Sequence, residues 1–510
     1  MAHNETVFTP EYIVKLILDE IGYVPMEYTA QEENKIRRRH IVDNSCGDGA
    51  FLCEVVRRYF RQSICDGYDK DKTIEENNKL IKEELETYIH GIELKSNLVE
   101  LTKDALDNVV GEFIDLNVLG KINWDIRCAD ALDISDFDGK MDYVVGNPPY
   151  CNVHHFGEKY EKYKTYSFMK DGMSDLYLLF FELGFKMLNP NGSLAYITPN
   201  SWFTSIAGKS LRKYIRDGNI NIDKIIQCGH EQVFSSVTTF SAITVFSKNH
   251  INHSKTFVWK TLNQCLEDYD NDTERWWKVN VDDAFINNKI YLGQADQLQF
   301  IRNILNNNKP KRVLVKNGFA TLKDKLFTNV MWLLGWLPPE MIYAIKSSTC
   351  EIKMLFYPYD RNGKPKKWEE FHPKLQSHLL DRAKALNINT TKDGWYLYGR
   401  TQGINDFMRY KIAVNNLIND SNDGKCGIKM AAAPAGVGVY GGLYMTPSES
   451  YANNEDFDEL DFNTKIFALL HSEMFMDYVK MLGHYKNGGY YTFTSKELES
   501  FLNYGWDILL

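Results

Sequence analysis

The residues best suited to chemistry form a short loop, Asn147-Pro148-Pro149-Tyr150, directly after an apolar stretch at residues 140–145. That stretch ends in two valines and predicts a buried strand. Two prolines can neither continue a strand nor start the interior of a helix. We therefore expect a stiff loop at the strand's carboxyl end, where open α/β sheets bind ligands. Two fixed acceptors, the Asn147 amide oxygen and a proline carbonyl, can hold both hydrogens of an exocyclic amine, and the Tyr150 ring can stack on a flat base.

The sequence upstream predicts the first unit of a nucleotide-binding sheet. Residues 39–43 have the pattern of a strand and residues 53–59 that of a helix, with Gly47 and Gly49 between them. Glycines allow a tight turn and a close approach of the ligand to the backbone. Because no third glycine follows at dinucleotide spacing, the loop disfavours a nicotinamide cofactor.

Acidic residues follow two further predicted strands. Residues 90–94 end in Glu93-Leu94, and residues 122–132 include Asp130 after the apolar core of the strand. A carboxylate at the first position can accept both hydroxyls of a ribose, and one at the second can accept from an adenine amino group. Nearer the start, Thr9 is suited to cap a helix whose first turn holds Pro10, which would point backbone N–H groups at a ligand carboxylate.

The pattern continues with more alternating elements. Residues 175–188 predict a strongly apolar helix, and residues 193–199, 222–229 and 240–247 predict strands. Between the last two strands lies a polar loop with one candidate for an exposed aromatic side chain, Phe234.

The composition limits the number of domains and the class of protein. The chain has 510 residues, of which 44% are apolar, which suffices for two or three domains. The net charge of −9 argues weakly against a nucleic-acid partner, although binding depends on a local basic surface. The sequence has no secretory leader, no run of eighteen apolar residues, and nine scattered cysteines without zinc spacing. We expect a cytoplasmic protein without a membrane span or a metal.

Together these motifs resemble those of a known family. The chain looks like an S-adenosylmethionine-dependent DNA adenine-N6 methyltransferase of the gamma class, the type found in restriction-modification systems. The motifs are residues 8–10, 43–51, 93, 130, 147–150, 175–177 and 234–246, in the order of that family and over about the first half of the chain. The resemblance implies an α/β fold in which residues 1–260 form a Rossmann-like catalytic domain with a seven-stranded, mostly parallel sheet and one antiparallel strand.

The resemblance also implies roles for individual residues. S-adenosyl-L-methionine is the expected cofactor. The residues expected to bind it are Phe8, Thr9, Pro10, Asp43, Ser45, Cys46, Gly47, Gly49, Glu93, Leu94, Asp130, Ala131 and Asn147. Some family members have an aromatic residue where this chain has Ala131, so stacking on the cofactor adenine is expected from Leu132 or a later residue.

The same resemblance implies a mechanism. Asn147 and the Pro148 carbonyl are expected to hold the adenine amine, so the catalytic residues are Asn147, Pro148, Pro149 and Tyr150. The target base must leave the stack, because its amine is unreachable inside a duplex. Tyr150 and Phe234 are then expected to sandwich it. Asn at the head of the loop favours adenine over cytosine N4, and no metal is required.

Residues 261–510 are expected to form an α+β domain that recognises the DNA target. An acidic stretch at residues 267–274 is a candidate linker, and residues 297–305 predict a helix. Basic residues interleaved with aromatic and amide side chains suit contacts to phosphates and base edges. The candidates for DNA binding are Lys311, Arg312, Lys316, Lys366, Lys367, Arg400 and Gln402. Double-stranded DNA is the expected partner, with a cognate restriction endonuclease encoded nearby as a further candidate.

Several other functions compete with this interpretation. Protein glutamine methyltransferases also use Asn-Pro-Pro-Tyr, but they are shorter and lack a large C-terminal domain. RNA adenine-N6 methylation fits the same loop. A non-catalytic specificity or scaffolding module would not need the intact loops around Gly47 and Asn147. A nuclease fused at the N-terminus is not expected, because the first motif begins at residue 8.

Overall fold

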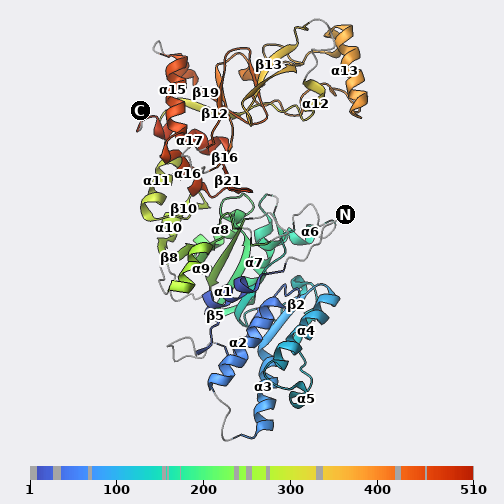
Figure 1. Ribbon diagram of the computed structural model, residues 1–510, viewed down its shortest axis with the longest axis vertical. Coiled ribbons are helices and arrows are strands. Elements are labelled where there is room, and N and C mark those ends of the chain that lie inside the picture. The colour runs from blue at the N-terminus through green and yellow to red at the C-terminus, as the bar shows by residue number, and fades with distance from the viewer. Residues whose placement is uncertain are drawn as a thin grey trace. The chain divides into compact units, whose positions relative to one another are not determined.

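The computed structural model divides the chain into two compact units, residues 1–298 and 299–510 (Figure 1). It describes residues 8–26, 36–66, 72–151, 157, 160–172, 174–231, 233–234, 240–248, 255–271, 276–328, 337–419, 427–453 and 457–508. The first unit contains the predicted catalytic loop.

The first unit is built on one mixed sheet. Its strand order is β3-β2-β1-β4-β5-β7-β6-β8-β9. The strands are β1 (Ile41–Asp43), β2 (Ile89–Glu93), β3 (Asp125–Cys128), β4 (Met141–Gly146), β5 (Leu188–Pro199), β6 (Asn221–Gln227), β7 (Ser241–Ser247), β8 (Thr256–Thr261) and β9 (Trp277–Asn280).

The strands that carry the predicted motifs run parallel to one another. β1 pairs in parallel with β2 and β4, β2 with β3, and β4 with β5. Their carboxyl ends therefore lie at one edge of the sheet. β1 has β2 on one side and β4 on the other, so the strand order reverses direction at β1. Open α/β sheets bind ligands at such a topological switch point.

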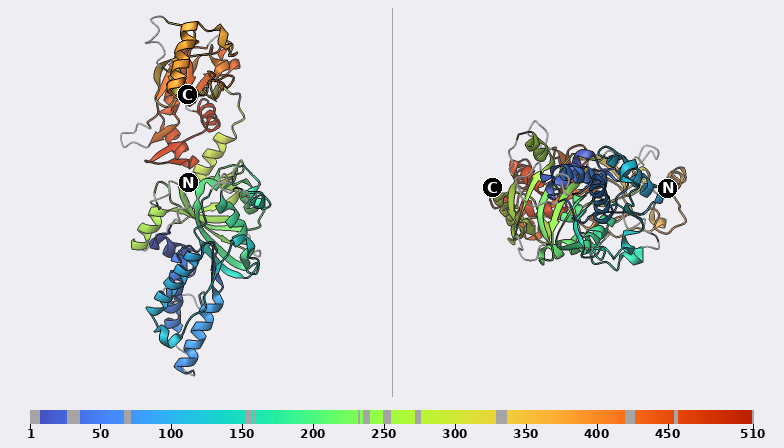
Figure 2. Two further views of the ribbon diagram at one scale, coloured as in Figure 1. Left: turned by 90° about the vertical axis from the view of Figure 1, so that its right-hand side faces the viewer. Right: turned by 90° about the horizontal axis from the view of Figure 1, so that it is seen from below.

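Helices cover both faces of this sheet, which Figure 2 shows from two further sides. On one face, residues of α1, α2 and α4 share a core cluster with Ala195 and Ile197 of β5. On the other face α7 packs so tightly that a Cβ on Gly184 would lie 2.4 Å from Leu194 and 2.7 Å from the Tyr196 hydroxyl. Nine of the twelve α7 residues are buried, which explains why its sequence is apolar on nearly every side.

The helices of the first unit alternate with the strands and are mostly short. They are α1 (Glu11–Glu20), α2 (Ala50–Asp66), α3 (Ile74–Tyr88), α4 (Ser96–Gly111), α5 (Leu116–Leu119), α6 (Tyr160–Tyr163), α7 (Leu176–Met187), α8 (Lys209–Arg216), α9 (Leu262–Asn271) and α10 (Val281–Ala284). Three 3-10 turns, η2 (Ala131–Asp133), η5 (Ser167–Met169) and η6 (Asn200–Phe203), and the hairpin of β10 (Phe285–Ile286) and β11 (Lys289–Ile290) complete the unit as far as it is described.

Three expectations about this unit were wrong. In the described part of the chain the sheet has nine strands and not seven, because β8 pairs in parallel with β6 and β9 pairs with β8. Two strands, β7 and β9, run antiparallel to their neighbours, where one was expected. The first unit runs past residue 260 to residue 298, and residues 267–271 of the expected linker belong to α9.

The second unit combines three small sheets with helices, an α+β arrangement. The sheets have the orders β12-β19-β15-β17, β14-β13-β18 and β16-β21-β20. Their strands are β12 (Val313–Asn317), β13 (Met341–Lys346), β14 (Glu351–Phe356), β15 (Lys411–Val414), β16 (Leu417–Asn419), β17 (Met430–Ala433), β18 (Gly438–Tyr440), β19 (Leu443–Pro447), β20 (Tyr485–Lys486) and β21 (Tyr490–Thr492).

The longest helix described in this unit is α13 (Pro373–Ala385), and three more long helices follow near the C-terminus. The expected helix at residues 297–305 is present as α11 (Ala295–Leu305), across the division between the units. The others are α12 (Asp324–Phe327), α13 (Pro373–Ala385), α14 (Glu449–Ala452), α15 (Glu459–Leu470), α16 (Glu473–Leu482) and α17 (Ser495–Gly505), with 3-10 turns η8 (Trp368–Glu370) and η9 (Ile404–Asp406). A capping box between Thr494 and Glu497 starts α17, and its buried Asn503 donates to the Val313 carbonyl of β12 at 2.8 Å.

None of the helices in the described residues combines the length and apolarity that a membrane crossing requires. No group of three or more His, Cys, Asp or Glu side chains in these residues is arranged to hold a metal ion.

Candidate active site

The predicted catalytic loop leaves β4 at Gly146, as the sequence predicted. A Cβ at this position would lie 2.8 Å from Oδ1 of Asp43, so only glycine lets the buried carboxyl of β1 approach so closely. Of the loop residues that follow, Pro148 is buried, Pro149 is exposed, and Asn147 and Tyr150 are half-buried. The loop is thus fixed at its base, Asn147 and Tyr150 are partly accessible, and the Asn147 amide oxygen itself is buried.

Asn147 connects three motifs that lie far apart in the sequence. Its side-chain Nδ2 donates a hydrogen bond to the Thr9 hydroxyl at 3.2 Å. Its main-chain oxygen accepts from the Ser45 hydroxyl at 3.4 Å. The start of α1, the loop after β1 and the loop after β4 therefore meet at one residue. Sequence reasoning placed Thr9 and Asn147 in the same site but gave no sign of this direct contact.

Tyr150 is held edge-on within a group of aromatic rings. Its hydroxyl donates to the Ile197 carbonyl at 3.1 Å, and burial raises its pKa well above the ordinary value. The ring centroids of Phe234 and Tyr177 lie 6.2 Å and 6.4 Å away, at interplanar angles of 72° and 84°. A main-chain bond from Leu176 to the Cys151 carbonyl, at 2.9 Å, joins α7 to the end of the loop.

The structure corrects the expectation for Phe234. This residue was predicted to be exposed in a polar loop, but only 4% of it is accessible, because it belongs to the core cluster beneath the Tyr150 ring. The remainder of that loop, residues 235–239, lies outside the described residues. Phe234 therefore contacts Tyr150 as a buried neighbour.

The glycine loop turns tightly between β1 and α2. Gly47 and Gly49 have φ values of +56° and +87°, in the region that favours glycine. A Cβ on Gly49 would lie 2.9 Å from the side chain of Thr102, whose hydroxyl also donates to the Gly47 carbonyl at 2.9 Å. Both glycines are thus favoured by conformation, and Gly49 is also required by packing against α4.

Glu93 and Asp130 lie at the carboxyl ends of neighbouring strands, where the sequence placed them. Glu93 accepts from the Gly47 N–H at 3.1 Å and from the Lys95 N–H at 2.9 Å, so its carboxylate is fixed against the glycine loop. Asp130 caps the turn that follows it by accepting from the Leu132 N–H at 3.2 Å. The two acids are therefore preoriented by backbone groups.

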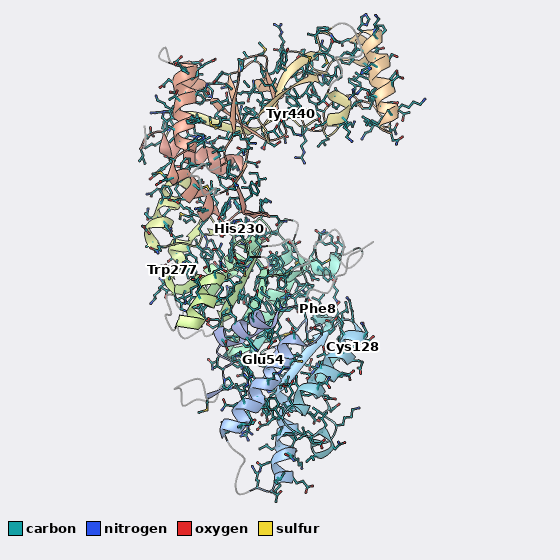
Figure 3. All side chains as sticks on the ribbon, viewed as in Figure 1. Phe8, Glu54, Cys128, His230, Trp277 and Tyr440 are labelled. Atoms are coloured by element: carbon teal, nitrogen blue, oxygen red, sulfur yellow. The ribbon has the colours of Figure 1, made fainter. Side chains whose placement is uncertain are left out.

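The rim and base of this site differ in character. Leu94 is 60% exposed, and Phe8, labelled in Figure 3, is 56% exposed. Ala131, by contrast, is buried. At the base, burial raises the pKa of Asp43 to about 7, and the charges of Glu93 and Asp48 add to the effect. The site thus combines exposed apolar side chains with a concentration of acidic groups.

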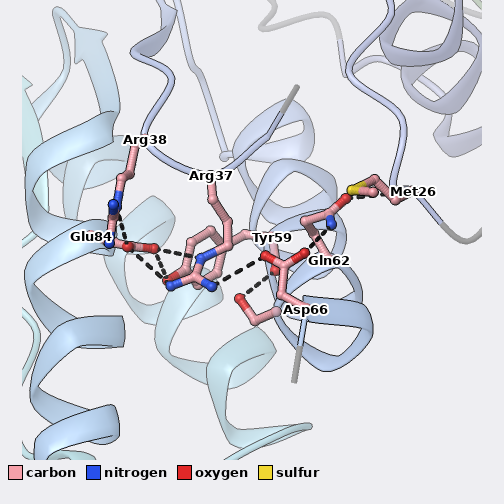
Figure 4. Close-up of polar contacts among 8 residues, drawn as sticks. Met26, Arg37, Arg38, Tyr59, Gln62, Asp66 and Glu84 are labelled. Atoms are coloured by element: carbon pink, nitrogen blue, oxygen red, sulfur yellow. Dashed lines mark hydrogen bonds and ion pairs between the residues drawn. The ribbon is translucent and has the colours of Figure 1, made fainter. Parts of the chain in front are cut away.

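A separate polar network lies near the amino-terminal ends of the strands. Arg37, shortly before β1, donates to Glu84 at 2.9 Å and to Asp66 at 3.2 Å, and the Tyr59 hydroxyl donates to Glu84 at 2.7 Å (Figure 4). A cavity of about 320 Å³ beside it is lined by residues that include Arg37 and Phe60. The predicted catalytic residues follow the opposite ends of the strands and do not line this cavity.

The candidate DNA-binding residues of the second unit fall into two groups. Four of the cations form ion pairs within the unit: Lys311 with Glu499, Arg312 with Asp507, Lys316 with Asp406, and Lys366 with Glu340. Lys367, Arg400 and Gln402 are exposed, and no acidic side chain of the described residues forms an ion pair with Lys367 or Arg400. The second group retains the charge and accessibility that phosphate or base contacts need.

Comparison with known proteins was made on the sequence and on the fold. Residues 32–234 match the Eco57I restriction-modification methylase family. The chain is 26% identical over 485 residues to the type II restriction enzyme and methyltransferase RM.Eco57I of Escherichia coli, covering 79% of this chain and 48% of that protein. It is 30% identical over 259 residues to the type II methyltransferase M.BstVI of Geobacillus stearothermophilus, covering 49% and 43%.

The fold has similar counterparts among solved structures. The type IIL restriction-modification enzyme MmeI, solved in complex with DNA, matches with a TM-score of 0.61 at 14% identity, covering 96% of this chain and 67% of that one. The chain spans about half the length of the two curated relatives. These comparisons confirm the resemblance to restriction-modification methyltransferases that the motifs predicted.

Proposed function

We propose that this chain, whose residues 32–234 match the Eco57I restriction-modification methylase family, is a site-specific DNA adenine-N6 methyltransferase. The observation that carries the proposal is the meeting of Thr9, Ser45 and Asn147 beside the glycine loop. The reaction is methyl transfer to the exocyclic amine of an adenine turned out of the duplex. Residues 299–510, which form the second unit, are the proposed target-recognition part.

The acidic lining of the site fits S-adenosylmethionine, whose sulfonium and ammonium groups are cationic. Burial raises the pKa of Asp43 to about 7, and the nearby carboxylates of Glu93 and Asp48 add to this effect. Gly47 and Gly49 adopt positive φ values, which glycine allows, and form the tight turn against which the cofactor is proposed to bind. When bound, S-adenosylmethionine supplies an electrophilic methyl group.

Individual residues have distinct roles in holding this cofactor. Glu93 accepts the ribose hydroxyls, for which a carboxylate fixed by two backbone N–H groups is well placed. Asp130 accepts from the adenine amino group. The exposed Leu94 side chain contacts the face of the adenine. It supplies the apolar contact that Ala131 cannot make, because Ala131 is buried. Thr9 and Pro10, at the start of α1, border the carboxylate end.

Asn147 and Pro148 position the target amine. The lone pair of an adenine amine is delocalised into the ring, so the nitrogen is a weak nucleophile. Accepting its two hydrogens with the Asn147 amide oxygen and the Pro148 carbonyl directs the lone pair along the reaction path. Thr9 holds the Nδ2 end of the Asn147 amide, which orients the acceptor oxygen toward the amine. Positioning of this kind can contribute roughly 7–11 kcal/mol at most.

Tyr150 and its neighbours receive the flipped base. The ring of Tyr150 is fixed at its hydroxyl by the Ile197 carbonyl and supported from below by Phe234. Stacking on such a rigid platform stabilises a base by about 1–3 kcal/mol, comparable with the few kcal/mol that flipping costs. Tyr150 is the proposed stacking surface, and the buried Phe234 supports it from the core.

The proposal is tested by sequencing modified bases in DNA from cells that express the chain or its Asn147→Ala variant. The expected result is N6-methyladenine at one short sequence with the wild type and none with the variant. N4-methylcytosine would make the assignment of the base wrong. Methyl groups transferred only to RNA or to a protein glutamine, in a parallel assay with radiolabelled cofactor, would refute DNA as the substrate.

A further inference from the structure

The second unit contains an exposed leucine in a conformation that leucine rarely adopts. Leu322 has a φ of +53° and is 67% exposed. Among the described residues outside glycine, six have positive φ; three are asparagines, which tolerate this region, and Leu322 is the one aliphatic residue. A left-handed backbone and an exposed isobutyl group are both unfavourable in the free protein. Their combination indicates a function for the side chain.

Leu322 lies against the segment that carries Arg400 and Gln402. Ala320 and Arg400 form two main-chain hydrogen bonds, at 2.9 Å and 3.0 Å. A Cβ on Gly399 would lie only 2.3 Å from Cδ1 of Leu322, so the leucine side chain covers the glycine that precedes Arg400. The exposed Leu322 side chain therefore lies beside the segment that carries the exposed Arg400, and the exposed Gln402 follows two residues later.

Both segments are held firmly from beneath. Thr321 is 1% exposed, and its hydroxyl donates to the Asp324 carboxylate. On the other side of Leu322, Lys323 donates to the Trp395 carbonyl at 2.8 Å. Leu322 therefore projects from fixed neighbours on both sides. A rigid base is what an inserting side chain requires, because a mobile one would be pushed aside by the base stack.

We propose that Leu322 is a wedge that inserts between base pairs of double-stranded DNA beside the contacts made by Arg400 and Gln402. The proposal rests on the proposed DNA methyltransferase function and deepens it by naming a residue that distorts the duplex. Apolar side chains on DNA-binding surfaces open base steps in this way, and neighbouring cations anchor the backbone. The occupant is double-stranded DNA, since Arg400 supplies positive charge and Gln402 can hydrogen-bond to a base edge.

The test uses the full-length chain and a duplex selected by binding from a random pool, so that it does not depend on methylation. Copies of that duplex carry 2-aminopurine at each position in turn, and its fluorescence rises where a base becomes unstacked. Leu322→Ala removes the tip. Leu322→Asn keeps a branched side chain suited to positive φ but removes its apolar character. Leu460→Ala, at another exposed leucine of the second unit, is the matched control.

The wild type is expected to brighten the probe at the flipped adenine and at one other step. Leu322→Ala and Leu322→Asn are expected to lose the second signal and bind roughly tenfold more weakly, while Leu460→Ala keeps both. Leu322→Asn should unfold thermally at or above the wild-type temperature, because the backbone strain is relieved. That result separates loss of contact from loss of fold.

A merely structural role predicts a different outcome. If no second step brightens, or if both Leu322 variants retain that signal and wild-type affinity, the wedge is refuted. A chain that selects a duplex and shows the second signal but methylates nothing would overturn the proposed methyltransferase function and leave the wedge standing. A chain that selects no duplex would overturn both.

Discussion

The amide of Asn147 donates to the hydroxyl of Thr9 across 3.2 Å, although the two residues are 138 positions apart in the chain. This bond joins the helix that begins the described chain to the proposed amine-binding loop. Thr9→Val keeps the shape of the side chain and removes the acceptor. A neutral hydrogen bond contributes about 0.5–1.5 kcal/mol, so kcat should fall roughly two- to tenfold while cofactor affinity changes little. An unchanged kcat in a single-turnover assay would show that the bond does not orient Asn147.

Replacing Asn147 tests the proposed amine contact itself. Asn147→Ala should abolish methyl transfer while leaving S-adenosylmethionine binding largely intact, because the side-chain acceptor belongs mainly to the target base. Transfer of radiolabelled methyl to duplex DNA and calorimetric binding measure the two effects. Asn123→Ala, at an exposed residue near the amino-terminal end of β3, is the control for a lost amide. Near wild-type transfer by Asn147→Ala would exclude this residue from positioning the amine.

Two substitutions at Tyr150 separate its ring from its hydroxyl. Tyr150→Phe loses the bond to the Ile197 carbonyl but keeps the stacking surface, so most activity should remain. Tyr150→Ala should lose about 1–3 kcal/mol of stacking, on the order of ten- to a hundredfold in target-base affinity. Fluorescence of 2-aminopurine at the target adenine reports the flipped state. Equal losses in both variants would indicate that the hydroxyl, and not the ring, is the important group.

The buried carboxyl of Asp43 makes stability depend on pH. Its pKa of about 7 in the folded chain exceeds the ordinary 3.8, so the folded state retains a proton that the unfolded state has released between those values. The free energy of unfolding should therefore fall as pH rises from about 4 to 7, by a few kcal/mol at most, at about 1.4 kcal/mol per pKa unit. Denaturant titrations of wild type and Asp43→Asn isolate this contribution.

The Asp43 carboxyl should also make cofactor affinity depend on pH, but affinity should rise with pH where stability falls. A cationic ligand favours the ionised form of Asp43, so affinity should rise between pH 6 and pH 8. Asp43→Asn should bind more weakly and show a flatter profile in calorimetry. A wild-type affinity that does not change over this range would place the cofactor's charges away from Asp43.

Arg400 distinguishes base reading from backbone contact in the second unit. If its exposed guanidinium reads a guanine edge, Arg400→Ala should cost about 1–3 kcal/mol at one position and relax the preference there. If it contacts a phosphate, binding should weaken equally for all sequences. The slope of the logarithm of the binding constant against the logarithm of the salt concentration should then become shallower by about one. Lys496→Ala, at an exposed lysine of α17, is the matched control for the loss of one positive charge. No effect on either measure would remove Arg400 from the interface.

Local sequence patterns were sufficient to predict the parts of the candidate site. An apolar run that ends in Gly146 and two prolines leaves few backbone choices, and the structure ends β4 and begins the loop where this predicts. Glu93 at the end of β2, Asp130 after β3, and the apolar helix at residues 176–187 follow from the same short-range rules. These features depend on neighbours in the chain, so sequence alone determines them.

The tertiary structure decided what depends on distant neighbours. The sequence gives no means of seeing that Phe234 would be buried in the core cluster, that β8 and β9 would extend the sheet, or that Thr9 would bond to Asn147. Lys311 is predicted to contact DNA, and only the folded chain shows that its ammonium group lies 2.6 Å from Glu499, 188 residues away. Burial and ion pairing are properties of the packed chain, because they are set by which surfaces meet and not by local residue preference.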